Sequence, residues 1–274
     1  MNLKEQLRLL NEEDALSDQC DELIDHMLHH IGSTDAELRD ELIYGTFARL
    51  IRGGHLENYQ LQRMLKTCLD DNHLFYHLSE SSGDAVFTRS FSSLVICLLL
   101  DQDHQAHFLT KQEIQEITDK SIRYVKEEKD TRGYVEEKGW AHSIAHGADL
   151  LASIVEHPSF ELTRSEDILL CIQNALFKGT VYTDDEDERL IVIIERLLKK
   201  GLEEAVLENW IASLFHHLHI RWEQEARSLA AYRLKTSVMN FARTLYFRLR
   251  FYGKGEDAQK QIEQQINHWY NKKA

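Results

Sequence analysis

Apolar residues recur at intervals of three and four along most of the chain, the spacing that places side chains on one face of an α-helix. The clearest such stripe consists of Leu190, Ile191, Ile194, Leu197 and Leu198. Helix-capping motifs of the form Thr-x-x-Glu begin at Thr34, Thr110 and Thr163. The chain contains a single proline, Pro158, although prolines are common in turns and edge strands. We therefore predict an all-α protein of about a dozen helices, without strands.

The expected helices recur in pairs at roughly 35–50 residues, close to the repeat length of helical solenoids. This spacing favours a HEAT-like, right-handed stack of antiparallel helix pairs (an α-α superhelix) over a compact bundle. Because no low-complexity linker interrupts the sequence, we expect residues 1–274 to form one elongated helical domain. The weakest joint is expected near residues 180–185, beside the acidic run Asp184–Glu188.

The charge balance and the apolar runs argue against two classes of partner. The formal net charge is −14, and because phosphate contacts are made by Lys and Arg, we expect no nucleic acid partner. The longest apolar run, Leu94–Leu100, is far shorter than the ~20 residues that cross a bilayer, so we expect no membrane partner. The N-terminus lacks a secretory signal pattern, and the cysteines form no CxxC pair. A soluble, cytoplasmic protein with reduced thiols is expected.

Polar chemistry is concentrated between residues 130 and 149, which we call the central segment. We expect a helix to begin near Gly139 and to continue to residue 156. At 100° per residue, His142, His146 and Asp149 share one face of this helix, and its apolar residues lie opposite. In a stack of helix pairs, the polar face would line the concave groove.

The first interpretation of the central segment is a site for a small polar or anionic ligand, or for a partner peptide. Arg132 and Lys138 would lie near the N-terminus of the expected helix, where free amides and the helix dipole favour an anion. Trp140, His142 and His146 would line the same groove. We favour this interpretation, a soluble binding protein, and leave enzymatic activity open.

The second interpretation is a divalent metal site formed by His142, His146 and Asp149, because His with carboxylate is a usual ligand set for transition ions. The ion would activate water in a metal-dependent hydrolase. The segment lacks, however, the Glu of the H-E-x-x-H motif that acts as a general base. The third interpretation is purely structural: the polar side chains form a network between helices, in which Asp149 pairs with Arg or His.

Three residues outside the central segment are further candidates for ligand binding. Arg89 begins an apolar helix, and it would either cap that helix at the surface, the more common role of such a residue, or reach the same groove. Glu188 lies in the first turn of another expected helix, where the helix dipole alone also favours a carboxylate. Arg243 precedes Arg250 by two helical turns, and this pair would either offer a phosphate a second clamp or pair with the acidic run Asp184–Glu188.

The central segment, extended to Leu150, resembles the signature of a bacterial family known as domain of unknown function 2785. Shorter stretches resemble secondary motifs of that family in matching order: Arg89–Ser92, Glu186–Leu190 and Phe241–Phe247. The resemblance implies an all-helical, HEAT-like architecture over most of the chain. It implies no activity, substrate or catalytic residue, so the functional interpretation depends on the side chains themselves.

Overall fold

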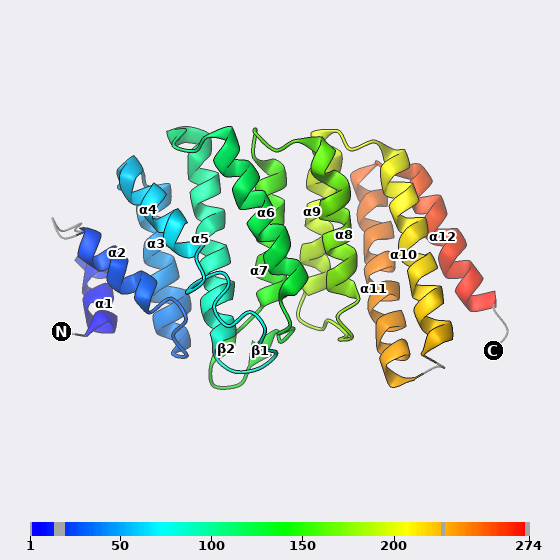
Figure 1. The fold of residues 1–274 in the computed structure, drawn as a ribbon, viewed down its shortest axis with the longest axis horizontal. Coiled ribbons are helices and arrows are strands. Elements are labelled where there is room, and N and C mark those ends of the chain that lie inside the picture. Colours follow the sequence, from blue (N-terminus) through cyan, green and yellow to red (C-terminus); the bar gives the residue numbers. More distant parts are fainter. Residues whose placement is uncertain (1, 14–19, 226–227, 272–274) are drawn as a thin grey trace. The chain divides into compact units, whose positions relative to one another are not determined.

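Twelve α-helices dominate the described part of the protein (Figure 1). The computed structural model describes residues 2–13, 20–225 and 228–271. The predicted all-α class is confirmed, but the expectation of no strands is wrong at one place. There, Tyr134–Val135 (β1) and Gly139–Trp140 (β2) pair as a short antiparallel hairpin.

The chain divides into two compact units, residues 1–159 and 160–274. The boundary follows Ser159, one residue after Pro158, and lies upstream of the joint predicted near residues 180–185. The single elongated domain stays a prediction, and each unit is described below by itself.

The first unit contains helices α1 to α7, a π-helix and the hairpin. Their bounds are α1 (Leu3–Glu13), α2 (Cys20–His29), π-helix η1 (Glu37–Tyr44), α3 (Gly45–Arg52), α4 (Asn58–Cys68), α5 (Ala85–Ala106), α6 (Lys111–Glu127) and α7 (Ser143–Glu156). Helix α5 packs against α3, α4 and α7, and α7 also packs against α6. These contacts make α5 and α7 the centre of the first unit.

Among the described helices, α5 has the length and apolar composition that could cross a membrane. Most of its apolar stretch is buried inside the protein, including Val95, Leu99 and Leu100. The apolar composition of α5 is therefore accounted for by its place in the core of the first unit.

Helix starts follow the predicted caps at one position and depart from them at two. At Thr110 the capping box is confirmed, since its hydroxyl accepts from the Glu113 amide at 3.2 Å and the Glu113 carboxylate accepts from the Thr110 amide at 2.7 Å. The box predicted at Thr163 is wrong, because this residue lies in a short 3-10 helix, η2 (Leu162–Arg164), before α8 begins. Next to Thr34, Asp35 provides the cap by accepting from the Leu38 amide at 3.1 Å.

The second unit contains η2 and five α-helices. The α-helices are α8 (Ser165–Leu176), α9 (Glu186–Lys200), α10 (Glu204–Gln224), α11 (Leu229–Tyr252) and α12 (Glu256–Asn271). Helices α10, α11 and α12 pack on one another and run in alternating directions (Figure 1). The apolar stripe predicted between Leu190 and Leu198 lies on α9 and is buried along its length.

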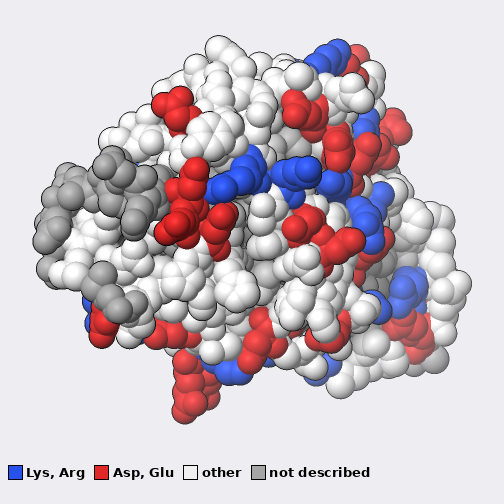
Figure 2. Space-filling view, turned by 60° about the vertical axis from the view of Figure 1, so that its left-hand side comes forward, with Lys and Arg blue, Asp and Glu red and all other residues white. Residues whose placement is uncertain are grey.

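Charged side chains of both signs are mixed on the face drawn in Figure 2. A row of Lys and Arg on that face is flanked on both sides by Asp and Glu. Because neighbouring charges on this face have opposite signs, their Coulomb fields partly cancel one another. This face therefore presents alternating charges rather than one broad basic field.

Candidate functional site

The loop between α6 and α7 carries most of the central segment and is folded back into the hairpin. Tyr134 pairs with Trp140 and Val135 with Gly139 across the two strands. Gly139 has φ +79°, in the left-handed region that favours glycine. A Cβ atom at Gly139 would lie 2.9 Å from the Cβ of Ala36 and 3.1 Å from a terminal nitrogen of Arg39. Glycine is therefore required here both by the turn and by the close approach of η1.

The buried side chain of Arg39 holds the hairpin by its backbone. This residue was not among those predicted from the sequence. Its side chain is fully buried and donates to the carbonyl oxygens of Ser33 at 2.7 Å and Lys138 at 2.9 Å. Asp40 forms its ion pair, with an N···O distance of 2.7 Å. The guanidinium also lies over the Phe87 ring, 4.3 Å from its centroid, which adds a cation–π contact. Burial raises the pKa of Asp40, while the charge of Arg39 opposes that rise.

Arg39 lies in the π-helix η1, three and four residues before Leu42 and Ile43. Residues at this spacing are neighbours on one helix face, so Arg39 lies on the face that carries these two apolar residues. Arg39 is buried beside Leu42 and Ile43 in this helix. The spacing of Arg39 from Leu42 and Ile43 was the available sequence signal, but its bonding partner, the Lys138 carbonyl oxygen, is distant along the chain.

Arg89 and Glu128 form a second buried arrangement, a bidentate ion pair with N···O distances of 2.7 and 2.8 Å. Arg89 also donates to the carbonyl oxygen of Tyr76 at 2.9 Å. Glu128 in turn accepts from the amides of Lys129 and Asp130, both at 2.9 Å. Burial acts to lower the pKa of Arg89, but the hydrogen bonds to Glu128 and the charge of that carboxylate together outweigh burial and raise the pKa. Arg89, predicted to reach a ligand groove, instead ties α5 to the start of the loop.

The two cations predicted to bind an anion already face carboxylates. Arg132 donates to Asp130 at 2.9 Å and to the carbonyl oxygen of Gly83 at 2.6 Å, and the hydrogen bond to Asp130 is the main cause of its raised pKa. Lys138 lies 2.7 Å from a carboxylate oxygen of Asp84. Their positive charges are therefore largely neutralised within the first unit.

The helix predicted to begin near Gly139 begins at Ser143, and that predicted start is wrong. His142 precedes the helix in a left-handed conformation with φ +46°, so it does not share an α-helical face with His146 and Asp149. His146 is buried on α7 with Nδ1 2.7 Å from Ser90 Oγ. Because the single Ser90 hydroxyl proton is donated to the Ala141 carbonyl, His146 Nδ1 is the donor to Ser90.

The described residues contain no group of three or more His, Cys, Asp and Glu side chains that could hold a metal ion. The rings of His142 and His146 have centroids 5.7 Å apart and meet edge to face. Asp149 contributes, after burial, to the raised pKa of the Cys97 thiol. The predicted triad of metal ligands is thus not assembled by this geometry.

Above the buried network, the hairpin exposes two aromatic side chains. Tyr134 is 57% exposed and Trp140 is 40% exposed. Their ring centroids lie 5.0 Å apart in an edge contact, and Trp140 stacks on His142 at 4.3 Å. The turn between them carries the exposed Glu136 and Glu137. Such a cluster offers apolar area and π-faces beside negative charge.

The remaining candidates, Glu188 and Arg243, lie in the second unit. The Glu188 carboxylate, a predicted ligand-binding group, accepts a hydrogen bond from Arg248 at 2.9 Å. Arg243 is exposed and donates to the Tyr270 hydroxyl at 2.9 Å, while Arg250 contacts Tyr246 at 3.4 Å. The predicted phosphate clamp of Arg243 and Arg250 stays a prediction.

Comparison with known proteins gives one match. A family model described as "Protein of unknown function (DUF2785)" matches residues 74–247. No curated protein and no solved structure matches the chain. The matched range contains the whole central segment together with Arg89, Glu188 and Arg243.

Proposed function

The chain belongs to the DUF2785 family of proteins of unknown function, and from its side chains we propose that it is a helical binding protein whose hairpin recognises a partner protein. One observation carries this proposal. The fully buried Arg39 donates to the carbonyl oxygens of Lys138 and Trp140, on both sides of Gly139. The Trp140 side chain is nevertheless 40% exposed to solvent. An exposed Trp whose backbone is held in place loses little freedom when a partner binds it, and this favours recognition.

The rigidity of the support matters because association loses the freedom of every side chain that it immobilises. Trp140 is stacked on His142 before any partner arrives, so binding would order it further by only a small amount. Trp and Tyr are also enriched among the residues that dominate binding energy at protein interfaces. Tyr134 and Trp140 together would form the centre of the proposed contact.

The charge around the hairpin favours a basic partner segment. Glu136 and Glu137 are exposed at the turn, whereas Arg132 and Lys138 are paired with Asp130 and Asp84. A Lys or Arg side chain would meet carboxylates and aromatic faces here, combining charge attraction with cation–π contact. An anionic ligand would meet cations that are already neutralised, and we therefore prefer a partner protein to the small anion.

We propose that the buried polar groups in and around the central segment have the structural role of the third interpretation. Arg89 and Glu128, which flank the segment in space, together with Asp130 and His146 hold the loop against α5 and α7 through buried bonds. We also propose that the helix pairs stack in the predicted HEAT-like manner, because such stacks commonly present extended recognition surfaces. The metal-dependent hydrolase is not retained, since its ligands do not converge in the described residues.

Selection of a random peptide library on the intact protein tests this function. We expect the enriched peptides to carry Lys or Arg beside apolar residues. For a synthetic enriched peptide, Trp140→Ala should weaken binding by about 10–30-fold, the loss that accompanies a hot-spot residue. Glu136→Lys should weaken it as well, because repulsion replaces attraction.

Phe251→Ala is the matched control, since Phe251 is an exposed aromatic residue of the second unit. This variant should bind the peptide as the unmodified protein does. Far-UV circular dichroism should confirm that Trp140→Ala keeps its helices. Enrichment of acidic peptides, or binding that survives Trp140→Ala, would refute the proposed function.

A further inference from the structure

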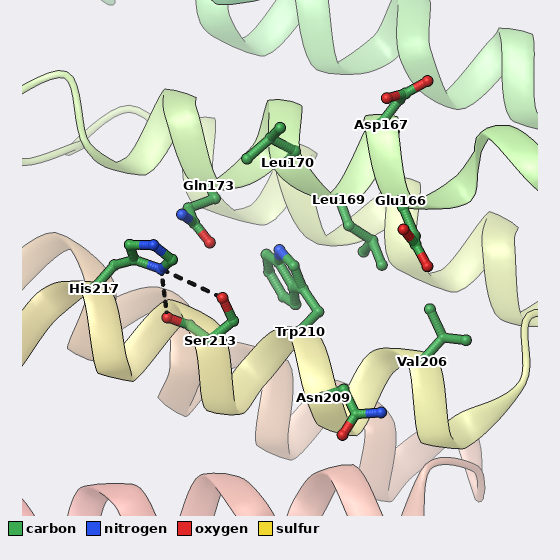
Figure 3. A pocket seen from close by; sticks show the side chains of 10 residues that line it. All are labelled: Glu166, Asp167, Leu169, Leu170, Gln173, Val206, Asn209, Trp210, Ser213 and His217. Carbon is green, nitrogen blue, oxygen red and sulfur yellow. Dashed lines mark hydrogen bonds between the residues drawn. The ribbon is translucent and has the colours of Figure 1, made fainter.

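A groove of about 470 Å³ lies between α8 and α10, wholly within the second unit (Figure 3). Its volume falls in the range of small-molecule sites, ~300–1,000 Å³. Leu169 and Leu170 form one apolar wall and Val206 lies opposite. This groove was not predicted at the sequence level, because its walls come from α8 and α10, which are separated along the chain by the whole of α9.

Trp210 lies in the middle of the groove and carries an unsatisfied donor. Only 8% of the residue is exposed, and its indole Nε1 is buried without a hydrogen-bond partner in the described structure. In Figure 3 the indole nitrogen points away from α10, toward Leu170 and Gln173. A buried N–H without an acceptor costs ~1–3 kcal/mol. An acceptor oxygen of a ligand in the groove would remove that cost.

One end of the groove is acidic. Glu166 and Asp167 line it from the first turn of α8, and the side chain of Asp167 accepts from Arg164 at 2.8 Å. Glu166 is exposed. The lining residues include no Lys or Arg. This end therefore favours a positively charged group.

The other end is polar, with Gln173, Ser213 and His217 (Figure 3). His217 Nδ1 lies 2.8 Å from the Ser213 carbonyl oxygen, so Nδ1 is the donor of that bond. Seven helical residues separate Glu166 from Gln173, which at 1.5 Å per residue corresponds to ~10 Å between the two ends.

We propose that this groove binds a small organic cation of amphipathic character. An ammonium or guanidinium group lies at Glu166, an apolar portion packs on Leu169, Leu170 and Val206, and a carbonyl oxygen accepts from Trp210 Nε1. This site goes beyond the hairpin function, since it belongs to the other unit and needs none of the hairpin residues.

The test uses the full chain labelled with ¹⁵N at its four Trp indoles. The probe is Nα-acetyl-lysine methylamide, and its uncharged counterpart is Nα-acetyl-norleucine methylamide. The indole signal of Trp210 is assigned with Trp210→Phe. Titration to about 20 mM, suited to millimolar affinity, should move the Trp210 indole proton downfield and leave the Trp140 signal in place.

The lysine probe should bind more tightly than the norleucine probe. Glu166→Gln should weaken the lysine probe by about 2–5-fold, the effect of one partly exposed charge, and leave the norleucine probe unchanged. Trp210→Phe should weaken both probes by about 2–10-fold through loss of one hydrogen bond. Glu256→Gln, which changes a first-turn glutamate on α12, is the matched control and should bind both probes normally.

Two results would overturn the site. One is an unmoved Trp210 indole signal at the highest probe concentration. The other is equal binding of the charged and uncharged probes together with no effect of Glu166→Gln. Neither readout depends on the folding of Trp210→Phe. If that variant does not fold, Trp140, Trp222 and Trp269 are each replaced by Phe, which assigns their indole signals. The fourth signal then belongs to Trp210.

Discussion

Breaking the buried Arg89–Glu128 pair should destabilise the first unit strongly. Glu128→Gln keeps the size of the side chain and an oxygen that can accept from the Lys129 and Asp130 amides. It removes the negative charge that faces Arg89, whose side chain is 1% exposed. Removal of one partner from a buried ion pair typically costs ~3–5 kcal/mol, because the other charge stays buried without compensation. We expect this magnitude for Glu128→Gln.

The reciprocal variant, Arg89→Met, should cost a similar amount, since it strands the Glu128 carboxylate and the Tyr76 carbonyl oxygen. The double variant should be much less destabilised than the sum of the single variants. Both charges are absent from the double variant, so it contains no buried charge without a partner. Such an uncompensated charge is the main cause of the lost stability in each single variant. The coupling between the two residues is the quantity that this argument predicts.

Urea unfolding followed by far-UV circular dichroism measures the free energies of unfolding. Because the chain has two compact units, hydrogen exchange of peptides covering residues 128–142 should show which unit is affected. Glu127→Gln is the matched control. It breaks an exposed pair with Arg123, and pairs of this kind contribute only ~0.3–0.5 kcal/mol. A loss below about 1 kcal/mol for Glu128→Gln, or additive single variants, would refute the reasoning.

Two further predictions concern the hairpin and the acidic run. Gly139→Ala should lower the free energy of unfolding in urea by about 2–4 kcal/mol, through both left-handed strain and the contact with Ala36. Gly54→Ala should lower it by only about 1 kcal/mol, because Gly54 has a φ of +66° but no atom within 4 Å of the added Cβ. Equal losses in the two variants would show that packing at Gly139 is unimportant. Burial raises the pKa of Glu186 in the folded protein above its ordinary value. At a pH above this raised pKa, the ionised carboxylate therefore lowers the free energy of unfolding. The loss disappears as the pH falls to the pKa of the unfolded chain, near 4.5. Glu186→Gln should therefore raise the melting temperature at pH 7, with a gain that shrinks toward pH 4, and a gain that is independent of pH would contradict this assignment.

Local patterns in the sequence were sufficient for some of the helices and caps, although not for the start of α7 or the cap predicted at Thr163. The stripe from Leu190 to Leu198 became the buried face of α9, and the Thr110 capping box formed as predicted. Both depend on residues within about two turns of one another, so the helical period and the cap chemistry define them directly. The central segment was likewise identified from its composition.

The direction of each polar side chain was decided only by the tertiary structure. Arg39 meets the Lys138 carbonyl oxygen across 99 positions of sequence, and Arg89 meets Glu128 across 39. The late start of α7 separated His142 from the face of His146. Burial of a charge depends on whether a distant partner arrives at bonding distance, and spacing along the chain contains no information about that partner. The sequence alone therefore located the polar segment, while long-range packing determined which of its residues became buried supports and which, like Trp140, remained exposed.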